Sequence, residues 1–257
     1  MPADESTPAI VLRARDYGES DRIVTLLTHG FGKLAGMAKG AKASRQRFER
    51  KLEPFSHVIL HFRRRPHGDL IFITRAEAAD LPQFAIDDDL GKIALGSYML
   101  ELADALTKEE AEASDAYGVL AGALRALAGG RAELSLRQAF ELKMLAWAGF
   151  GLEFARCRNC GAVVGANGGA AYFVTGRGGV LCSRCRPAVP EGAIRLDGAS
   201  AAALARLGAA AIDDAPGTAP AGADGALAIT RFLSSVLDRR LRSAEFLESI
   251  LSSERRT

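Results

Sequence analysis

Four cysteines form the most chemically specific pattern in this chain. They are arranged as two Cys-x-x-Cys pairs about twenty residues apart, and they are the only cysteines present: Cys157, Cys160, Cys182 and Cys185. Two thiolates of each pair can point at one tetrahedral ion, and four thiolates leave no coordination position open for water. The spacing therefore predicts one structural zinc ion (Zn²⁺) rather than a catalytic metal.

Three other uses of four cysteines compete with zinc. Two disulfides need an oxidising compartment, but the residues from Met1 to Ser6 have neither the basic nor the apolar region of a signal peptide. No apolar run approaches the length of a membrane span. A thioredoxin-like site needs one such motif after a strand, not a matched pair. An iron–sulfur cluster ranks second to zinc, and we expect a cytoplasmic protein.

Basic residues are concentrated in one part of the sequence. Ten Lys and Arg residues lie between Lys33 and Arg65, and only Glu49 and Glu53 oppose them, whereas the segment from Asp87 to Glu112 is acidic. Short charge runs are usually solvated surface, but a long and nearly unopposed one is typical of polyanion binding. The candidate DNA-binding residues are Arg13, Arg15, Lys33, Lys39, Lys42, Arg45, Arg47, Arg50, Arg63, Arg64 and Arg65.

The elements that must position these basic residues are short strands. Apolar and polar residues alternate in five segments within the first 80 residues, separated by turn residues. Five short strands favour a small closed barrel, of which the OB-fold is one architecture. The alternation places His57 and His61 on the outer face with Arg63, and they are interpreted as surface residues. The predicted strands are 10–15, 23–27, 34–38, 57–63 and 70–74.

Helical periodicity begins after this barrel. Asp87, Asp88 and Asp89 favour a helix start, and a third helix is predicted to open with a capping box formed by Ser135 and Gln138. The Ala-, Gly- and Pro-rich stretch 213–225 is predicted to be a mobile linker. The other predicted helices cover 115–128, 199–207 and 227–251.

These elements predict an α+β chain. An N-terminal OB-fold β-barrel precedes a C-terminal α-helical domain, into which a zinc module with four cysteine ligands is inserted. The predicted domains are a DNA-binding barrel (1–80), a first helical part (81–152), the zinc module (153–190) and a final helical part (191–257).

A search for catalytic motifs weakens the case for an enzyme. Gly32-Lys33 is followed by Leu34 rather than by the Ser or Thr of a phosphate-binding loop. The Gly-x-Ser-x-Gly pattern of hydrolases does not occur, and there are only four histidines for acid–base work. We therefore predict a protein that is not an enzyme, with a metal-dependent nuclease as a rival.

Several segments together resemble the bacterial RecO family of recombination mediators along nearly the whole chain. The first is 11–23, which reads VLRARDYGESDRI, and the second is 32–41 with Gly-Lys-Leu and Ala-Lys-Gly-Ala. The others are Leu-Glu-Pro-Phe at 52–55, Phe-Glu-Leu-Lys-Met-Leu at 140–145, Gly-Gly-Val-Leu-Cys at 178–182 and Arg-Ser-Ala-Glu-Phe-Leu at 242–247.

The resemblance implies a function in DNA repair and recombination. It implies an OB-fold barrel, a helical domain and a zinc module, with binding to single- and double-stranded DNA and annealing of complementary strands. It further implies action with RecR to load RecA onto strands coated by single-strand-binding protein (SSB), and hence a nucleoid-associated cytoplasmic protein.

The resemblance also implies a binding site for the acidic tail of SSB. Where the family has a basic residue just before the Phe-Glu-Leu motif, this chain has Gln138 and Ala139. The hypothesis is an apolar groove in the helical domain, with basic side chains that hold the tail. Its residues are Arg137, Phe140, Lys143 and Met144.

One alternative places the nucleic-acid site elsewhere. In a zinc-ribbon regulatory factor the metal module itself reads nucleic acid, and five arginines keep this open: Arg156, Arg158, Arg177, Arg184 and Arg186.

Overall fold

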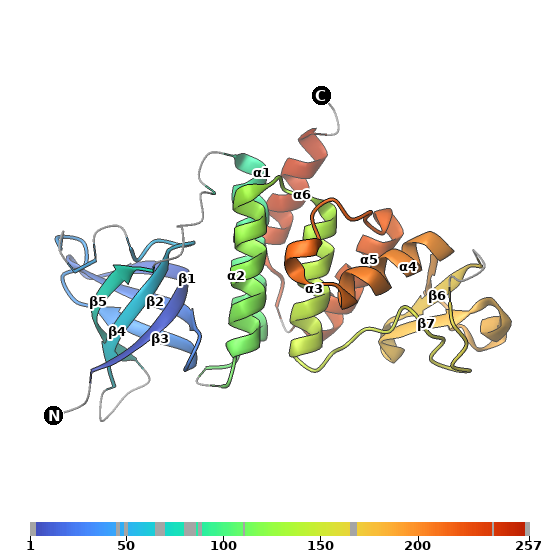
Figure 1. The fold of residues 1–257 in the computed structure, drawn as a ribbon, viewed down its shortest axis with the longest axis horizontal. Helices are drawn as coiled ribbons and strands as arrows, with labels where there is room; N and C mark the ends of the chain where they lie inside the picture. Colours follow the sequence, from blue (N-terminus) through green and yellow to red (C-terminus); the bar gives the residue numbers. More distant parts are fainter. Residues whose placement is uncertain are drawn as a thin grey trace. The chain divides into compact units, whose positions relative to one another are not determined.

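The fold is described from a computed structural model. It describes residues 4–44, 47–48, 51–64, 70–79, 86, 89–109, 111–164, 169–237 and 239–254. The chain divides into two units, one of residues 1–129 and 243–257 and the other of residues 130–242. Each unit is considered by itself (Figure 1).

The first unit begins with a five-stranded closed barrel, shown in blue to teal in Figure 1. Its order is β1-β2-β3-β5-β4, and β1 pairs with β4 to close it; every pairing is antiparallel except β3 with β5. This OB-like topology confirms the predicted fold class. The strands are β1 (Glu5–Tyr17), β2 (Asp21–Thr28), β3 (Gly32–Ala38), β4 (His57–Arg63) and β5 (Ile71–Ala78).

The barrel interior is filled by alternate residues of every strand, including Val24, Leu34, Leu60 and Ile73. A Cβ built on Gly36 would lie 2.7 Å from the Ile73 side chain, so the glycine allows β3 and β5 to approach closely enough to close the barrel. A register shift between Val11 and Arg13 marks a bulge in β1. After this bulge, Arg13 and Arg15 are exposed.

The described part of the first unit also contains the helices α1 (Leu90–Leu106), α2 (Ser114–Gly129) and α6 (Arg242–Glu254). Asp89 caps α1, and its side chain accepts from the Lys92 N–H at 3.0 Å. The predicted roles of Asp87 and Asp88 lie outside the described residues. Glu101 of α1 accepts hydrogen bonds from the backbone and hydroxyl of Ser243, which ties α6 to α1.

The second unit combines helices with a small three-stranded sheet of order β7-β6-β8. Helix α3 packs against α4 and α5, and the sheet belongs to the segment that holds the cysteines, shown in yellow and orange in Figure 1. The elements are α3 (Leu134–Trp147), β6 (Ala171–Val174), β7 (Gly179–Cys182), β8 (Ile194–Leu196), α4 (Gly198–Ala209) and α5 (Gly222–Val236). Three short 3₁₀ turns lie at Thr175–Arg177, Ser183–Ala188 and Ile212–Asp214.

Two local predictions for this unit were wrong, for one shared reason. Ser135 and Gln138 form no capping box, because the helix begins at Leu134 and Gln138 is fully buried. The Gln138 side chain instead accepts from the Ala221 N–H at 2.9 Å. The stretch 213–225 is not a free linker: Ala215 and Ala221 are buried, and Gly217 N–H donates to Glu133 at 2.8 Å. Side chains at the start of α3 thus hold a segment that composition alone marks as mobile.

Among the described residues, no helix is long and apolar enough to cross a membrane.

Candidate nucleic-acid interface and metal centre

One face of the barrel carries a hollow between basic side chains. It has a volume of about 330 Å³ and is lined by residues of β1, β2 and β3 together with Leu70 and Glu109. Its lining combines the apolar side chains of Ala14, Ile23 and Ala35 with the exposed Arg13 and Arg15. In OB-folds the face of strands 2 and 3 is a common oligonucleotide-binding surface. The hollow combines that location with a surface for a base and cations for a phosphate.

The two arginines of this hollow differ in their contacts. Arg13 donates to the Thr25 hydroxyl at 3.2 Å and lies 3.7 Å from Asp104, while its side chain remains 66% exposed. Arg15 is exposed. Both guanidinium groups can therefore contact an anion.

A second group of basic residues lies where two loops meet at one end of the barrel. The Lys42 N–H donates to Ser20 O at 3.0 Å and the Gly40 N–H donates to Asp21 at 2.8 Å, so the loop after β3 packs on the turn between β1 and β2. The Gly40 hydrogen bond lowers the pKa of the Asp21 carboxyl below its usual range. Lys39 and Arg47 are exposed on this loop.

Tyr17 is an exposed aromatic residue at the same end, and the sequence reasoning missed it as a functional residue. It ends β1 opposite Asp21, and 53% of its surface is exposed. An exposed aromatic ring beside basic residues is a platform on which bases of single-stranded nucleic acid stack. Its position at the last residue of a strand, next to a Gly-containing turn, is the signal that could have identified it.

The remaining predicted DNA-binding residues are held in ion pairs or lie outside the described residues. Lys33 is only 12% exposed and pairs with Asp104 at 3.2 Å. The pairs at the surface are Lys42 with Asp16 (2.9 Å), Arg63 with Asp4 (2.8 Å) and Arg64 with Glu5 (3.4 Å). Arg45, Arg50 and Arg65 lie outside the described residues.

His57 is not at the surface, which corrects the interpretation of the two histidines. It is 1% exposed, and its Nε2 lies 2.5 Å from the Tyr117 hydroxyl of α2. Burial lowers the pKa of His57, and Arg125 lowers it further; burial likewise raises the pKa of Tyr117 to about 12. The outer face of β4 at His57 is covered by a helix, which the strand alternation alone does not reveal.

The four cysteines meet in one cluster. Their sulfur atoms all lie within 4.8 Å of one another, and Cys160 Sγ is 3.7 Å from Cys182 Sγ. Sulfurs around a tetrahedral ion with metal–sulfur distances of about 2.3 Å are about 3.8 Å apart, whereas a disulfide brings its sulfurs to about 2.05 Å. The four residues could therefore hold a metal ion.

Main-chain hydrogen bonds stabilise the thiolate form of Cys157. Cys157 donates its N–H to Ala162 O at 2.8 Å, and the Gly161 N–H returns to Cys157 O at 2.9 Å, which forms the first tight turn. The Cys182 N–H donates to Cys157 Sγ at 3.3 Å. Burial raises the pKa of the Cys157 thiol, but hydrogen bonds from the main chain of Cys182, Cys160 and Asn159 outweigh it and lower the pKa to about 6. These N–H groups favour the thiolate, which is the form that binds metal.

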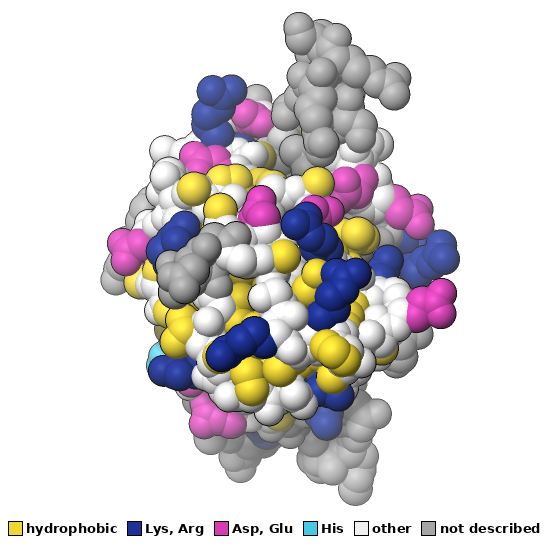
Figure 2. Space-filling model, turned by 90° about the vertical axis from the view of Figure 1, so that its right-hand side faces the viewer, with side chains coloured by type: hydrophobic (Ala, Val, Ile, Leu, Met, Phe, Trp, Pro, Cys, Tyr) yellow, Lys and Arg dark blue, Asp and Glu magenta, His cyan; other side chains and the backbone are white. Residues whose placement is uncertain are grey.

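Exposed basic side chains occur in the same segment as the cysteines. Figure 2 shows the face that carries β6 and β7: Lys and Arg side chains stand among apolar and neutral ones, and acidic side chains lie in the upper part of the face and around its margin. The five arginines of an alternative zinc-ribbon reader are all exposed: Arg156, Arg158, Arg177, Arg184 and Arg186.

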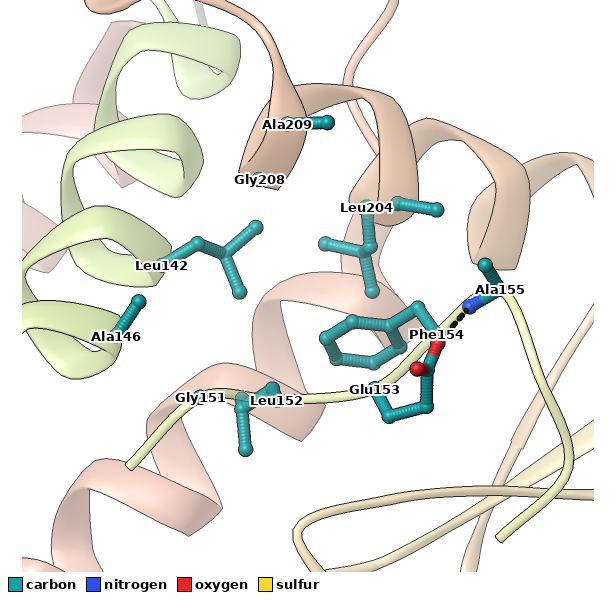
Figure 3. Close-up of a pocket in the computed structure, with 11 residues that line it drawn as sticks. Leu142, Ala146, Gly151, Leu152, Glu153, Phe154, Ala155, Leu204, Gly208 and Ala209 are labelled. Atoms are coloured by element: carbon teal, nitrogen blue, oxygen red, sulfur yellow. Dashed lines mark hydrogen bonds between the residues drawn. The ribbon is translucent and has the colours of Figure 1, made fainter. Parts of the chain in front are cut away.

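An apolar pocket of about 260 Å³ lies in the second unit (Figure 3). Leu142 and Ala146 of α3 form one wall, Leu204 and Gly208 of α4 a second, and Leu152 to Ala155 the third. Beside it, Lys143 is half-buried and its Nζ lies 3.4 Å from Gly208 O. Burial lowers the pKa of this lysine.

The predicted tail-binding residues lie around this region, with different exposure. Phe140 and Met144 are fully buried in the core, and Arg137 is 6% exposed and bonded to buried Glu141 at 2.9 Å. Of the four residues, only Lys143 adjoins the pocket surface.

Comparison with known proteins agrees with this architecture. The family described as Recombination protein O N terminal matches residues 1–82, and Recombination protein O C terminal matches residues 87–245. The chain belongs to the RecO family.

Curated RecO relatives match over nearly their full length. A DNA repair protein RecO of Anaeromyxobacter sp. strain K is 40% identical over 245 residues, which is 94% of each chain. The DNA repair proteins RecO of a Nocardioides species and of Streptomyces avermitilis are each 36% identical to this chain, and each match covers 93% of it. The matches cover 97% of the Nocardioides protein and 96% of the Streptomyces protein.

Proposed function

We propose that this protein is a recombination mediator in DNA repair. It binds single- and double-stranded DNA, anneals complementary strands, including SSB-coated ones, and together with RecR helps to load RecA. The observation that carries the proposal is the RecO family match over both parts of the chain, together with an OB-like barrel whose β1–β3 face has an arginine-lined hollow. The match to the whole chain favours this function over a zinc-ribbon regulatory factor.

The proposed mechanism uses binding energy alone. A basic barrel surface neutralises the phosphates of two strands and lowers their mutual repulsion, so complementary bases can meet. Contacts to phosphates rather than to base edges make this binding independent of sequence. We therefore propose that the protein is not an enzyme and that annealing requires no nucleotide hydrolysis.

We assign a structural role to the metal and propose that it is zinc. Four thiolates complete a tetrahedron around Zn²⁺ and leave no site for a reacting water. The ion would hold the turn at Cys157–Gly161 against the end of β7 at Cys182. DNA binding is assigned to arginine and lysine side chains rather than to the ion.

The DNA-binding proposal is tested by removing two exposed barrel cations. Arg15→Ala with Lys39→Ala should flatten the dependence of log affinity on log salt by about 1.4 for single-stranded DNA, because each phosphate contact contributes about 0.7. Arg131→Ala with Arg240→Ala removes equal charge from exposed positions of the second unit and should change little. Equal slopes for the two double variants would place the DNA site elsewhere.

The mediator proposal itself is tested by annealing. Complementary strands precoated with SSB should anneal with this protein in the absence of ATP, and the barrel variant should be slower than the control variant at equal concentration. Failure of the wild-type protein to anneal coated strands would reject the mediator function, even if naked DNA is bound.

For the SSB tail, we propose the pocket of Figure 3 as the docking site. An apolar hollow beside a lysine fits a peptide that has both apolar and acidic residues. This moves the hypothesis from Phe140 and Met144, which are buried, to the Leu142 side of the same helix, and it retains Lys143. Arg137 is excluded from the test because its charge balances buried Glu141.

Two substitutions test this site without cutting into the core. Lys143→Glu removes the cation, and Ala146→Glu places a carboxylate at an exposed pocket position. Both should weaken binding of a fluorescent SSB-tail peptide while naked-DNA annealing remains. Ala199→Glu, at an exposed position of α4 outside the pocket lining, is the matched control. Normal peptide binding by both pocket variants would reject the site.

A further inference from the structure

We propose that the cysteine module, residues 153–190, carries a second contact surface for the phosphate backbone of nucleic acid. The surface is formed by Arg156, Arg158, Arg177, Arg184 and Arg186. The inference rests on the proposed DNA-binding function and adds a site outside the barrel.

The first support is unbalanced charge. All five arginines are exposed, and within the described part of the chain none of them pairs with an acidic side chain. Glu153 is the one acidic residue of the module, and its carboxylate accepts the N–H groups of Ala155 and Arg156 at 2.7 and 2.9 Å. It therefore stabilises a turn, and it forms no ion pair with these guanidinium groups in the described part of the chain.

The metal cluster does not account for this charge. Four thiolates around a divalent ion leave two negative charges, and five arginines exceed them. If the arginines only balanced the cluster, they would be expected to turn inward toward the sulfurs. Cys185 Sγ instead accepts its side-chain hydrogen bond from the neutral Asn159, whose Nδ2 lies 3.4 Å away.

The arginine contacts orient the guanidinium groups without neutralising them. Arg156 donates to Gly161 O at 3.4 Å, and Arg158 donates to Gly151 O and Gly178 O at 3.4 and 3.5 Å. Arg186 donates to the Tyr172 hydroxyl at 2.6 Å and lies 5.4 Å from the ring centre. The short Arg186 bond positions its guanidinium group, and the longer contacts of Arg156 and Arg158 restrain theirs only weakly. All of these partners are neutral, so the charge and the remaining donors stay available for phosphate.

The choice of nucleic acid follows from the form of this surface. The five arginines are spread along the segment from 156 to 186, all of them exposed, and none of them lines the apolar pocket of the second unit. A distributed array of cations fits the regular charge of a polynucleotide backbone. An acidic peptide is the other outcome, and the test separates the two.

The test uses Arg177 and Arg184, because both are exposed and the hydrogen bonds described for this module do not involve their side chains. In the full-length, metal-loaded protein, Arg177→Ala with Arg184→Ala should flatten the salt dependence for single-stranded DNA by about 1.4. The matched control is again Arg131→Ala with Arg240→Ala. Metal content per chain is measured for every variant.

A charge-retaining pair guards against an indirect effect on folding. Arg177→Lys with Arg184→Lys should keep the wild-type slope, because a phosphate contact needs the charge. If the Ala pair and the Lys pair behave alike, or if the Ala pair matches the control, the surface does not bind DNA. A normal DNA slope with weakened binding to an acidic peptide would also reject it in favour of a peptide site.

The barrel variant separates this inference from the proposed function. If Arg15→Ala with Lys39→Ala flattens the slope and the module variant does not, only the second surface is rejected. If the wild-type protein shows no salt-dependent DNA binding, the proposed function fails as well. If both surfaces contact one DNA, the combined four-residue variant should lose the sum of the two slope changes.

Discussion

Lys33 of β3 and Asp104 of α1 form the most buried ion pair between the barrel and a helix described here. Lys33 Nζ donates to Asp104 O at 2.7 Å and to its carboxylate at 3.2 Å, and the two side chains are 12% and 8% exposed. Arg13 lies 3.7 Å from the second carboxylate oxygen. The arrangement joins the edge of the barrel at Arg13 and Lys33 to α1.

Removal of this carboxylate should destabilise the protein. Asp104→Ala leaves Lys33 buried without its counter-ion, and loss of one partner of a buried pair typically costs about 3 kcal/mol. Chemical denaturation with a shared m-value measures it. Lys42→Ala breaks an exposed pair with Asp16 and should shift the midpoint much less. Similar shifts for the two variants would contradict a buried role for Asp104.

The stability of the first unit should fall in mild acid because of His57. Burial lowers the pKa of His57 in the folded protein, so the unfolded chain, with a pKa of about 6.5, takes up the proton first. Stability from this group is complete above about pH 6.5 and is lost as the pH falls below it. Denaturation midpoints between pH 7.5 and 5 should decline less in His57→Gln than in wild type. His61→Gln, on the same strand, is the control, and an unchanged decline in His57→Gln would refute the assignment.

One metal ion should be bound per chain, and we expect it to be zinc. Elemental analysis of the native protein measures the stoichiometry. Cys157→Ser removes one of four ligands and should release the ion and loosen the module, while Ser183→Ala, an exposed non-ligand between the second pair of cysteines, should retain it. Native protein without metal and with disulfide-bonded cysteines would show that the cluster has another purpose.

Tyr17 should contribute to binding of single-stranded DNA through stacking. Tyr17→Ala removes an exposed ring, and loss of one base–aromatic stack costs about 1–3 kcal/mol of binding free energy. Tyr17→Phe keeps the ring and should bind as wild type. The salt dependence should be unchanged in both variants because no charge is removed. Equal affinities of the Ala and Phe variants would exclude stacking at this position.

Local patterns in the sequence located the barrel strands and the four cysteines that could hold a metal ion, but the single helix predicted over 227–251 was wrong, because α5 ends at Val236 and α6 begins at Arg242. Strand alternation and turn residues located all five barrel strands, and the short spacing within each Cys-x-x-Cys pair brings two sulfurs together through one tight turn. Such features depend on a few neighbouring residues, so their geometry can be read along the chain.

Only the tertiary structure decided which charges are available. Between Lys33 and Arg65 the sequence shows almost no acidic residues, yet Asp104, Asp16 and Asp4 come from other elements and pair with Lys33, Lys42 and Arg63. Packing likewise decided that α2 covers His57 and that Gln138 accepts a hydrogen bond from Ala221, which lies 83 residues further along the chain. An ion pair or a buried hydrogen bond depends on distance in space, and a pattern along the chain does not contain that distance until the elements have packed.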